Sequence, residues 1–205
     1  MKIIIASKQH YKYASIICDT METSAKVRGT GIAKRTPEFI MEKIEEGNAI
    51  IGLDGDQFVG FSYIQTWEHG RFIANSGLIV HPNYRGLGIA KKIKKKIFKL
   101  SQEKYPNAKI FSITTGLAVM KMNSELGYKP VTFSELTTDK TFWKACQSCP
   151  NYDVLSRTSY KMCLCTGMLY EPKQKKGVIR NLTFYPSFNR LEKKISKESL
   201  VKAQI

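Results

Sequence analysis

Residues 84–90 have types and spacing that suit the binding of a phosphate group. The run Tyr-Arg-Gly-Leu-Gly-Ile-Ala follows an apolar stretch that ends near Val80, and it leads directly into a basic helix. Backbone N–H groups at a helix N-terminus lack intrahelical partners, and the helix dipole makes that end positive. Gly86 and Gly88 let the backbone approach an anion closely, while Arg85 adds a permanent charge. The pattern predicts a pyrophosphate-binding loop.

Two cysteine pairs near the C-terminus form a second group with potential chemistry. Cys146 and Cys149 make a Cys-x-x-Cys pair, and Cys163 and Cys165 make a Cys-x-Cys pair, with thirteen residues between the two pairs. Four thiolates at such spacing suit a closed, structural zinc site. Alternatively, the second pair alternates along a strand and consists of small buried hydrophobic residues.

The elements that position these residues follow from hydrophobic periodicity and turn signals. Asp54-Gly55 indicates a hairpin, Thr36-Pro37 a helix start, and Gly127 a helix end. We expect strands over residues 2–6, 48–53, 57–67, 72–80, 110–115, 128–133 and 163–170, and helices over 9–27, 37–46, 90–104 and 117–126. This order predicts an α/β fold with a mixed, mostly antiparallel sheet flanked by helices and followed by a cysteine-bearing appendage.

The net charge of +16 in 205 residues would suit an anionic partner. However, the basic residues gather in one helix and in the tail, without interleaved aromatic residues that could stack on bases. We therefore expect a solvated helix face and tail, and disfavour nucleic-acid binding. The helix lysines expected opposite the isoleucine stripe are Lys91, Lys92, Lys94, Lys95, Lys96 and Lys99.

Length and composition favour one main domain with additions at its C-terminal end. We divide the chain into a main domain (1–136), a cysteine-pair region with a last strand (137–171) and a basic extension (172–205). No apolar stretch is long enough for a signal peptide or a membrane span. A cytoplasmic protein without a membrane partner is expected, with its thiols reduced.

The loop and the strand before it resemble the GNAT superfamily of acyl-CoA-dependent N-acyltransferases. Arg85, Gly88 and Ala90 fit the signature Arg/Gln-x-x-Gly-x-Gly/Ala, and residues 80–84 look like the strand end that accompanies it. The resemblance covers residues 2–133, and the order of strands and helices agrees with the GNAT fold. It implies acetyl-CoA or succinyl-CoA as co-substrate and a small-molecule amine as acceptor. A homodimer is compatible with this interpretation.

The resemblance also implies roles for individual residues. The backbone of Leu78, Ile79 and Val80 would pair with the pantetheine amides, and the N–H of Val80 would polarise the thioester carbonyl while a neutral amine attacks it. The strand after Ile110 would diverge from its neighbour, so that Thr114 lines the acceptor side of the opening and Thr115 the cofactor side. The pyrophosphate would be held by Arg85, Gly86, Leu87, Gly88, Ile89 and Ala90.

The groups for proton transfer depart from the family pattern. Many relatives carry a glutamate on the strand that here spans residues 72–80, but this strand has Asn75 and Ser76. The candidates are therefore Asn75 with a water chain, or Glu68 or His69 nearby. A tyrosine acid is doubtful because Asn123 occupies the corresponding helical position.

Two arginines near the expected acceptor pocket favour an anionic acceptor. Arg28 and Arg35 flank the loop between the first two helices, and an arginine can hold a carboxylate through two parallel hydrogen bonds. The alternative is that they are solvent-exposed. Residues 112–115, followed by 120–122 and 126–128, are similar to segments of bacterial glutamate N-acetyltransferases.

Taken with residues 27–37 and 127–136, these segments resemble Bacteroidetes-type GNAT proteins of arginine biosynthesis, which implies glutamate as the acceptor. Two alternatives remain. One is a GNAT enzyme that modifies protein or ribosomal amines, and the other is a zinc-stabilised, basic nucleic-acid-binding protein.

Overall fold

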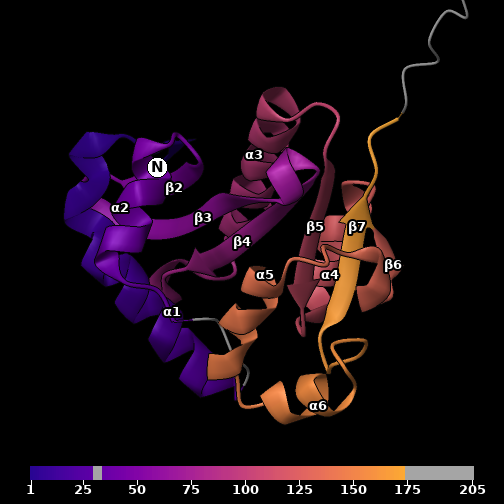
Figure 1. Cartoon of the computed structure of the whole chain (residues 1–205). Coiled ribbons are helices and arrows are strands. Elements are labelled where there is room, and N and C mark those ends of the chain that lie inside the picture. The colour runs from indigo at the N-terminus through magenta and orange to yellow at the C-terminus, as the bar shows by residue number, and fades with distance from the viewer. Residues whose placement is uncertain (30–33, 174–205) are drawn as a thin grey trace, which may run out of the picture. The chain divides into compact units, whose positions relative to one another are not determined.

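Within residues 1–29 and 34–173, the part of the chain that this computed structural model describes, seven strands form one sheet. The strand order is β1-β2-β3-β4-β5-β7-β6, and helices cover both faces (Figure 1). The expected mixed, mostly antiparallel α/β architecture is thereby confirmed. The strands are β1 (Lys2–Ile5), β2 (Ala49–Asp54), β3 (Gln57–Trp67), β4 (Phe72–Val80), β5 (Lys109–Thr114), β6 (Lys129–Val131) and β7 (Thr166–Tyr170).

The helices agree closely with the hydrophobic periodicity, and two short ones were not expected. Residues 8–13 form a 3-10 helix before α1, whereas α5 and α6 are too short to show a helical repeat in the sequence. The α-helices are α1 (Ala14–Arg28), α2 (Pro37–Glu45), α3 (Ile89–Lys104), α4 (Leu117–Glu125), α5 (Lys140–Lys144) and α6 (Tyr152–Arg157). Short 3-10 helices span Lys8–Tyr13, Glu68–Gly70, Pro82–Tyr84, Phe133–Glu135 and Ala145–Ser148.

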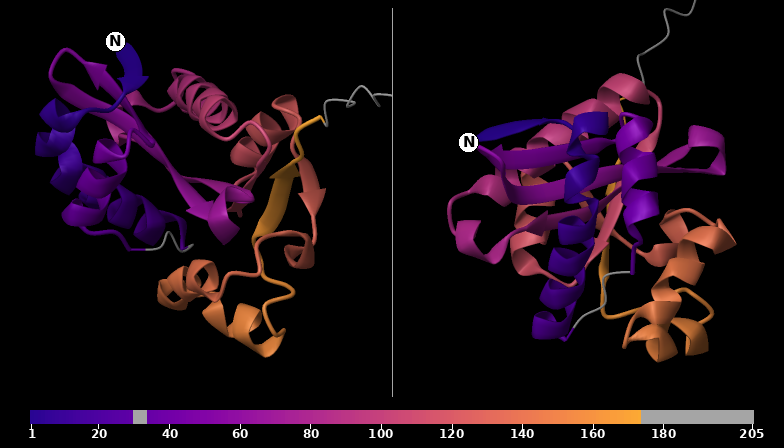
Figure 2. Two further views of the ribbon diagram at one scale, coloured as in Figure 1. Left: turned by 45° about the horizontal axis from the view of Figure 1, so that its top comes forward. Right: turned by 90° about the vertical axis from the view of Figure 1, so that its left-hand side faces the viewer.

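Helices lie on both faces of the sheet (Figure 2), and hydrophobic side chains are buried on each face. The isoleucines Ile89, Ile93 and Ile97 of α3 are each at most 2 % exposed and pack against one face. Burial of each such side chain contributes about 1.5–3 kcal/mol. On the opposite face, α1 and α2 cover the first strands, and α5 and α6 cover the region around β5 and β7. The sheet is therefore the middle layer of a three-layer arrangement.

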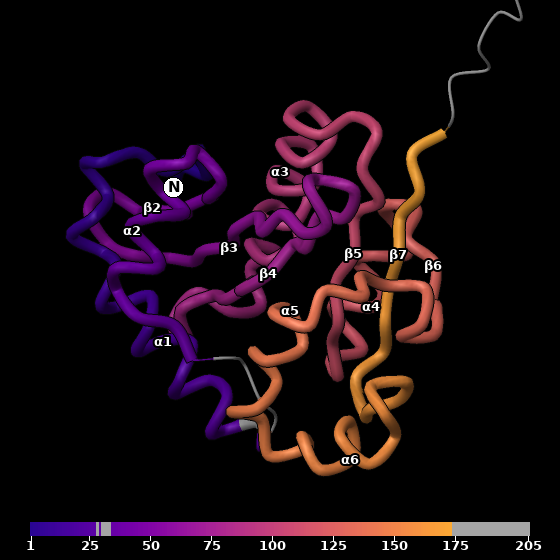
Figure 3. The backbone as a smooth tube through the Cα atoms, in the orientation of Figure 1, coloured from indigo at the N-terminus to yellow at the C-terminus, as the bar shows by residue number. Residues whose placement is uncertain are grey.

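The C-terminal part of the chain completes this same sheet. The backbone passes from α6 into β7, which runs between β5 and β6 and is antiparallel to both (Figure 3). Because β7 begins at Thr166, Cys163 and Cys165 precede the strand and do not alternate along it, contrary to the expectation for residues 163–170. The division at residue 136 stays a prediction. The basic extension lies outside the described residues from position 174 onwards.

Among the residues with a described position, we find no helix whose length and apolar character would let it cross a lipid bilayer.

Candidate active site

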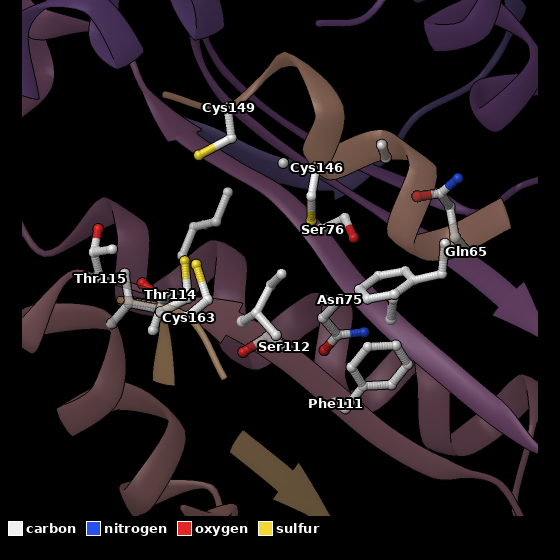
Figure 4. A pocket seen from close by; sticks show the side chains of 18 of the residues that line it. Gln65, Asn75, Ser76, Phe111, Ser112, Thr114, Thr115, Cys146, Cys149 and Cys163 are labelled. Atoms are coloured by element: carbon white, nitrogen blue, oxygen red, sulfur yellow. The ribbon is translucent and has the colours of Figure 1, made fainter. Parts of the chain in front are cut away.

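The central feature of the site is the divergence of two parallel strands. β4 and β5 pair only through Phe72–Lys109, Ile73–Ile110 and Ala74–Phe111. Past these pairs the strands separate, and a cavity of about 450 Å³ occupies the space between and beside them. Figure 4 shows Asn75 and Ser76 of β4 across this cavity from Ser112 and Thr114 of β5.

A bulge in β4 shapes the β4 side of the cavity. The register with β3 shifts between Phe61 and Tyr63, and Gly77 has a φ of +63°, in the left-handed region that favours glycine. Asn75 faces α3, and so does Val80, although their spacing is odd. One extra residue at the bulge accounts for this, because alternation in an unbroken strand would put them on opposite faces.

The predicted pyrophosphate loop has the backbone conformation that its sequence indicates. Gly86 and Gly88 have φ values of +81° and +71°, and Gly88 is the residue that precedes the first turn of α3. The first-turn N–H groups of α3 receive no side-chain cap from this residue. They are therefore available to an anion at the positive end of the helix dipole.

The side chain of Arg85 makes two hydrogen bonds to residues outside this loop. Its Nε donates to the backbone oxygen of Val80 at 3.2 Å, and its Nη2 donates to Oγ of Ser24 in α1 at 2.8 Å. The side chain thus ties the end of β4 to α1. The role predicted for Arg85 in holding a pyrophosphate stays a prediction.

Arg35 lies at the cavity, where it is held by two aromatic residues. Its Nε donates to the hydroxyl of Tyr63 at 2.7 Å, and its guanidinium carbon lies 4.9 Å from the ring centre of Phe39. Burial raises the pKa of Tyr63 despite the nearby Arg35 charge, so the phenol stays neutral and accepts this bond. Within residues 1–29 and 34–173, no carboxylate forms an ion pair with Arg35. The described part of the cavity wall therefore contains a cation without a carboxylate partner among the described residues.

The side chain of Arg28 and residues 30–33 lie outside the described part of the structure, so the predicted role of Arg28 stays a prediction.

A buried polar cluster lies where β4 and β5 begin to separate. Asn75 Nδ2 donates to Oγ of Ser101 at 2.8 Å, while Asn75 Oδ1 accepts from the hydroxyl of Tyr128 at 2.9 Å. Lys94 Nζ lies 3.4 Å from the same Oδ1 and 3.5 Å from the Tyr128 hydroxyl. Asn75 and Lys94 both line the cavity.

Lys94 corrects the expectation of a fully solvated lysine face on α3. Only 2 % of its surface is exposed, and burial lowers its pKa from 10.5 to about 7. The sequence contained a signal for this position, because Lys94 is four residues after Ala90 and four before Phe98, on the apolar side of the helix.

On the other side of the cleft, α4 contributes an asparagine where a tyrosine acid was considered. Asn123 is fully buried, and its Nδ2 donates to Oγ of Ser112 on β5 at 2.8 Å. Its Oδ1 has no hydrogen-bond partner among the described residues. An amide has no proton to give at neutral pH, so Asn123 is unable to act as a general acid.

Glu68 is not placed to act as a base. Its carboxylate accepts hydrogen bonds from Thr137 Oγ1 at 2.8 Å and from the backbone N–H of Thr138 at 2.7 Å. Burial alone would raise its pKa, but these bonds and the charge of Arg71 lower it overall. Glu68 does not line the cavity and instead holds the chain that enters α5. We find no support for this catalytic candidate.

Cys146, Cys149, Cys163 and Cys165 all line the cavity. Figure 4 shows the first three of them in its wall. Burial raises the pKa of Cys146 to about 11 and that of Cys165 to about 12. In the described part of the chain, no three Cys, His, Asp or Glu side chains are arranged to hold a metal ion. The expected structural zinc is therefore not supported, and the cysteines serve in this structure as walls of the cavity.

The remaining predicted residues fall into two groups. Leu78, Thr114 and Thr115 line the cavity, whereas Ile79 and Val80 belong to the part of β4 nearer the loop. Val80 is five residues beyond Asn75, roughly 16 Å along a strand. The roles assigned to these residues stay predictions.

Comparison with protein families gives one match. A family model described as the acetyltransferase (GNAT) family matches residues 19–122, which are 104 of the 205 residues. This stretch includes the last ten residues of α1, all of α2, the β4 bulge, the glycine loop (residues 84–90), α3 and most of α4. A search of curated protein sequences gave no match.

Several solved structures share the fold at low sequence identity. The Rv2747 protein of Mycobacterium tuberculosis, solved with CoA, has a TM-score of 0.58 at 14% identity, with 83% of this chain and 99% of that chain covered. N-acetylglutamate synthase of Neisseria gonorrhoeae, solved with coenzyme A and N-acetyl-glutamate, has a TM-score of 0.58 at 13% identity, and the match covers 83% of this chain but only 35% of that one.

A third structure is the ribosomal-protein-S18-alanine N-acetyltransferase of Escherichia coli, with a TM-score of 0.52 at 10% identity and coverage of 83% and 93%. At these identities the likeness concerns the fold.

Proposed function

We propose that the acceptor is the amino group of a small anionic amino acid. The premise is that the chain belongs to the acetyltransferase (GNAT) family and is therefore an N-acyltransferase that uses an acyl-CoA. Glutamate is the leading candidate, with acetyl-CoA or succinyl-CoA as donor. The observation that carries this proposal is Arg35, a cation fixed at the cavity wall by Tyr63 and Phe39.

The charge of Arg35 supports an anionic acceptor because a guanidinium binds a carboxylate with two parallel hydrogen bonds. Tyr63 occupies its Nε, and Nη1 donates to the backbone oxygen of Lys34 at 3.1 Å. These contacts fix the plane of the guanidinium before a substrate arrives. Preorganisation of this kind lowers the entropy cost of binding.

The size of the cavity supports a small acceptor. A volume of about 450 Å³ lies in the range typical of small-molecule sites. Its wall combines aromatic side chains such as Trp67 and Phe142 with the hydroxyls of Thr114 and Thr115. These features suit a polar metabolite with a short aliphatic part, and glutamate acylation would place the enzyme in arginine biosynthesis.

The thioester would lie where β4 and β5 separate. A pantetheine arm that starts at the glycine loop and follows β4 reaches the bulge at Gly77 and Leu78, which line the cavity. We therefore favour a backbone N–H at the bulge, rather than that of Val80, as the group that polarises the acyl carbonyl. Positioning of the two substrates supplies most of the acceleration.

The direct test is the release of free CoA by the purified full-length chain. Acetyl-CoA and succinyl-CoA are each offered with glutamate, aspartate, glutamine and an alanine-terminated peptide, and the acylated product is identified by mass spectrometry. We expect turnover with glutamate above that with glutamine, which has the same length without the charge. Turnover with the peptide alone would favour the alternative of protein or ribosomal N-acylation.

The Arg35→Gln variant tests the charge complementarity itself. Loss of a charged, bidentate contact costs about 1.5–3 kcal/mol, so KM for glutamate should rise about 10- to 100-fold while KM for acyl-CoA changes little. The matched control is Arg157→Gln, which removes an exposed arginine of α6. Equal KM values for glutamate in the two variants would contradict an anionic acceptor at Arg35.

A further inference from the structure

The buried lysine of α3 has no role in the function described so far. Lys94 is 2 % exposed and its amino group lies among neutral partners, namely the amide of Asn75 and the hydroxyl of Tyr128. In the part of the chain that the structure describes, burial is the one effect that shifts its pKa, and no carboxylate contributes. A lysine that only stabilised the fold would be expected to pair with a carboxylate or reach solvent.

The side chain of Lys94 forms part of the cavity wall. Lys94 lines the cavity together with Asn75, at the point where the pairing of β4 with β5 stops. The polar cluster joins three separate parts of the chain. Asn75 belongs to β4, Tyr128 directly precedes β6, and Lys94 and Ser101 belong to α3. Burial also raises the pKa of Tyr128 well above 10, so Tyr128 remains a neutral phenol beside Lys94.

The two faces of the sheet present different groups to the cleft. Arg35 and Tyr63 lie on the face covered by α1 and α2, where the acceptor is proposed to bind. Lys94 lies on the opposite face, which is covered by α3, the helix that begins at the glycine loop. An amine that attacks from the Arg35 side therefore has Lys94 on the far side of the acyl carbon.

We propose that Lys94 is the general acid that protonates the departing CoA thiolate. The inference rests on the proposed acyl transfer. The neutral amine of the acceptor forms the C–N bond to the acyl carbon, and the C–S bond breaks with its electron pair on sulfur. An N–H bond of the Lys94 ammonium breaks as its proton moves to that sulfur. The acceptor nitrogen releases its extra proton to water, and Lys94 regains a proton from water.

With Lys94 as the acid, the reaction does not need a tyrosine on α4. Asn123 occupies the position considered for that acid and has no acidic proton. Lys94, with a pKa of about 7, is protonated in a large fraction of molecules near neutral pH and gives up its proton readily. Asn75 and Tyr128 orient the amino group, so they are positioning residues.

The test compares Lys94→Met with Lys95→Met. Methionine is similar in length to lysine, and its burial avoids the cost of burying an amine, so the variant should fold. Lys95 is the exposed neighbour on the same helix. We expect kcat to fall about 100-fold or more in Lys94→Met and to stay within about twofold in Lys95→Met.

The pH profile distinguishes an acid from a merely structural lysine. Because the acid must be protonated, kcat of the unmodified enzyme should decline as the pH rises above about 7, and this decline should be absent in Lys94→Met. A binding experiment adds a readout without turnover. CoA should bind more weakly to Lys94→Met than to the unmodified chain, whereas desulfo-CoA, which lacks the thiol, should bind both equally.

The outcomes separate this inference from the proposed function. Transfer of the acyl group by Lys94→Met with unchanged kcat and pH profile would overturn the role of Lys94 and leave the proposed function intact. If the enzyme does not acylate glutamate but acylates another amine in a reaction that depends on Lys94, glutamate is not the acceptor. That result would still support Lys94 as the general acid. A loss of CoA and desulfo-CoA binding alike in Lys94→Met would show a structural lysine and overturn the inference.

Discussion

At the scale of single residues, the glycine loop depends on backbone conformation rather than on close packing. Gly88 has a φ of +71°, yet a Cβ placed on it would meet no atom within 4 Å. Its requirement for glycine therefore comes from the left-handed conformation, which costs a residue with a side chain about 1–2 kcal/mol. Gly55, in the β2–β3 hairpin, has a φ of +55° and the same open surroundings.

This pair of glycines allows a matched test of the phosphate-binding role. Gly88→Ala and Gly55→Ala should each lower the free energy of unfolding by about 1–2 kcal/mol, as measured by denaturant titration. Only Gly88→Ala should weaken CoA binding, by about tenfold in calorimetry, because it changes the approach of the backbone to the pyrophosphate. Similar CoA affinities in the two variants would argue against a phosphate at this loop.

At the scale of elements, the bulge in β4 decides which side chains reach the cleft. It sets Asn75 towards α3 and leaves Gly77 against the ring of Tyr63, the residue that holds Arg35. A Cβ on Gly77 would overlap that ring and lie 2.9 Å from Cε of Met21. Unlike Gly88, Gly77 is therefore constrained by both conformation and space.

The bulge can be tested by comparing Gly77→Ala with Gly70→Ala. Strain in the left-handed region and overpacking together should cost Gly77→Ala about 2–5 kcal/mol of unfolding free energy. Gly70 has a φ of +85° with open space around it, so Gly70→Ala should lose only about 1–2 kcal/mol. Thermal unfolding of the two variants would measure these changes in the free energy of unfolding. Equal changes would mean that Gly77 is not packed tightly against Tyr63.

At the scale of the whole molecule, the cavity combines segments that are far apart in the chain. Residues near the end of the described chain, including Cys146 and Cys149, face the same space as Arg35. Burial raises the pKa of Cys146 to about 11, so at pH 8 its reactive thiolate amounts to about one part in a thousand, against roughly a quarter for an ordinary thiol.

Alkylation can report whether substrates fill this cavity. Without ligand, Cys146 should react slowly with an alkylating reagent. The reaction rate should increase as the pH rises towards about 11, because the thiolate fraction of Cys146 grows. CoA with a saturating acceptor should slow this reaction about tenfold by excluding the reagent from the cavity. Cys18 on α1 does not line the cavity and serves as the control. Ligand-independent alkylation of Cys146 would contradict the placement of the acceptor beside it.

The sequence by itself determined the features that depend on neighbouring residues. The glycine loop, the start of α2 at Pro37 and the hairpin at Gly55 follow from local conformational preferences. The long helices and strands follow from apolar periodicity, which reports the side that each element buries. These elements include those on either side of the glycine loop, so the fold class was predictable.

Only the tertiary structure decided which distant residues meet. The insertion of β7 between β5 and β6, the cysteine wall and the contact of Glu68 with Thr137 arise from pairings that leave no periodic signal. Lys94 lies between these cases, because helical spacing placed it on the apolar side of α3, whereas its partners Asn75 and Tyr128 come from other parts of the sheet. Long-range packing, rather than local propensity, thus made a buried amine out of one lysine among many.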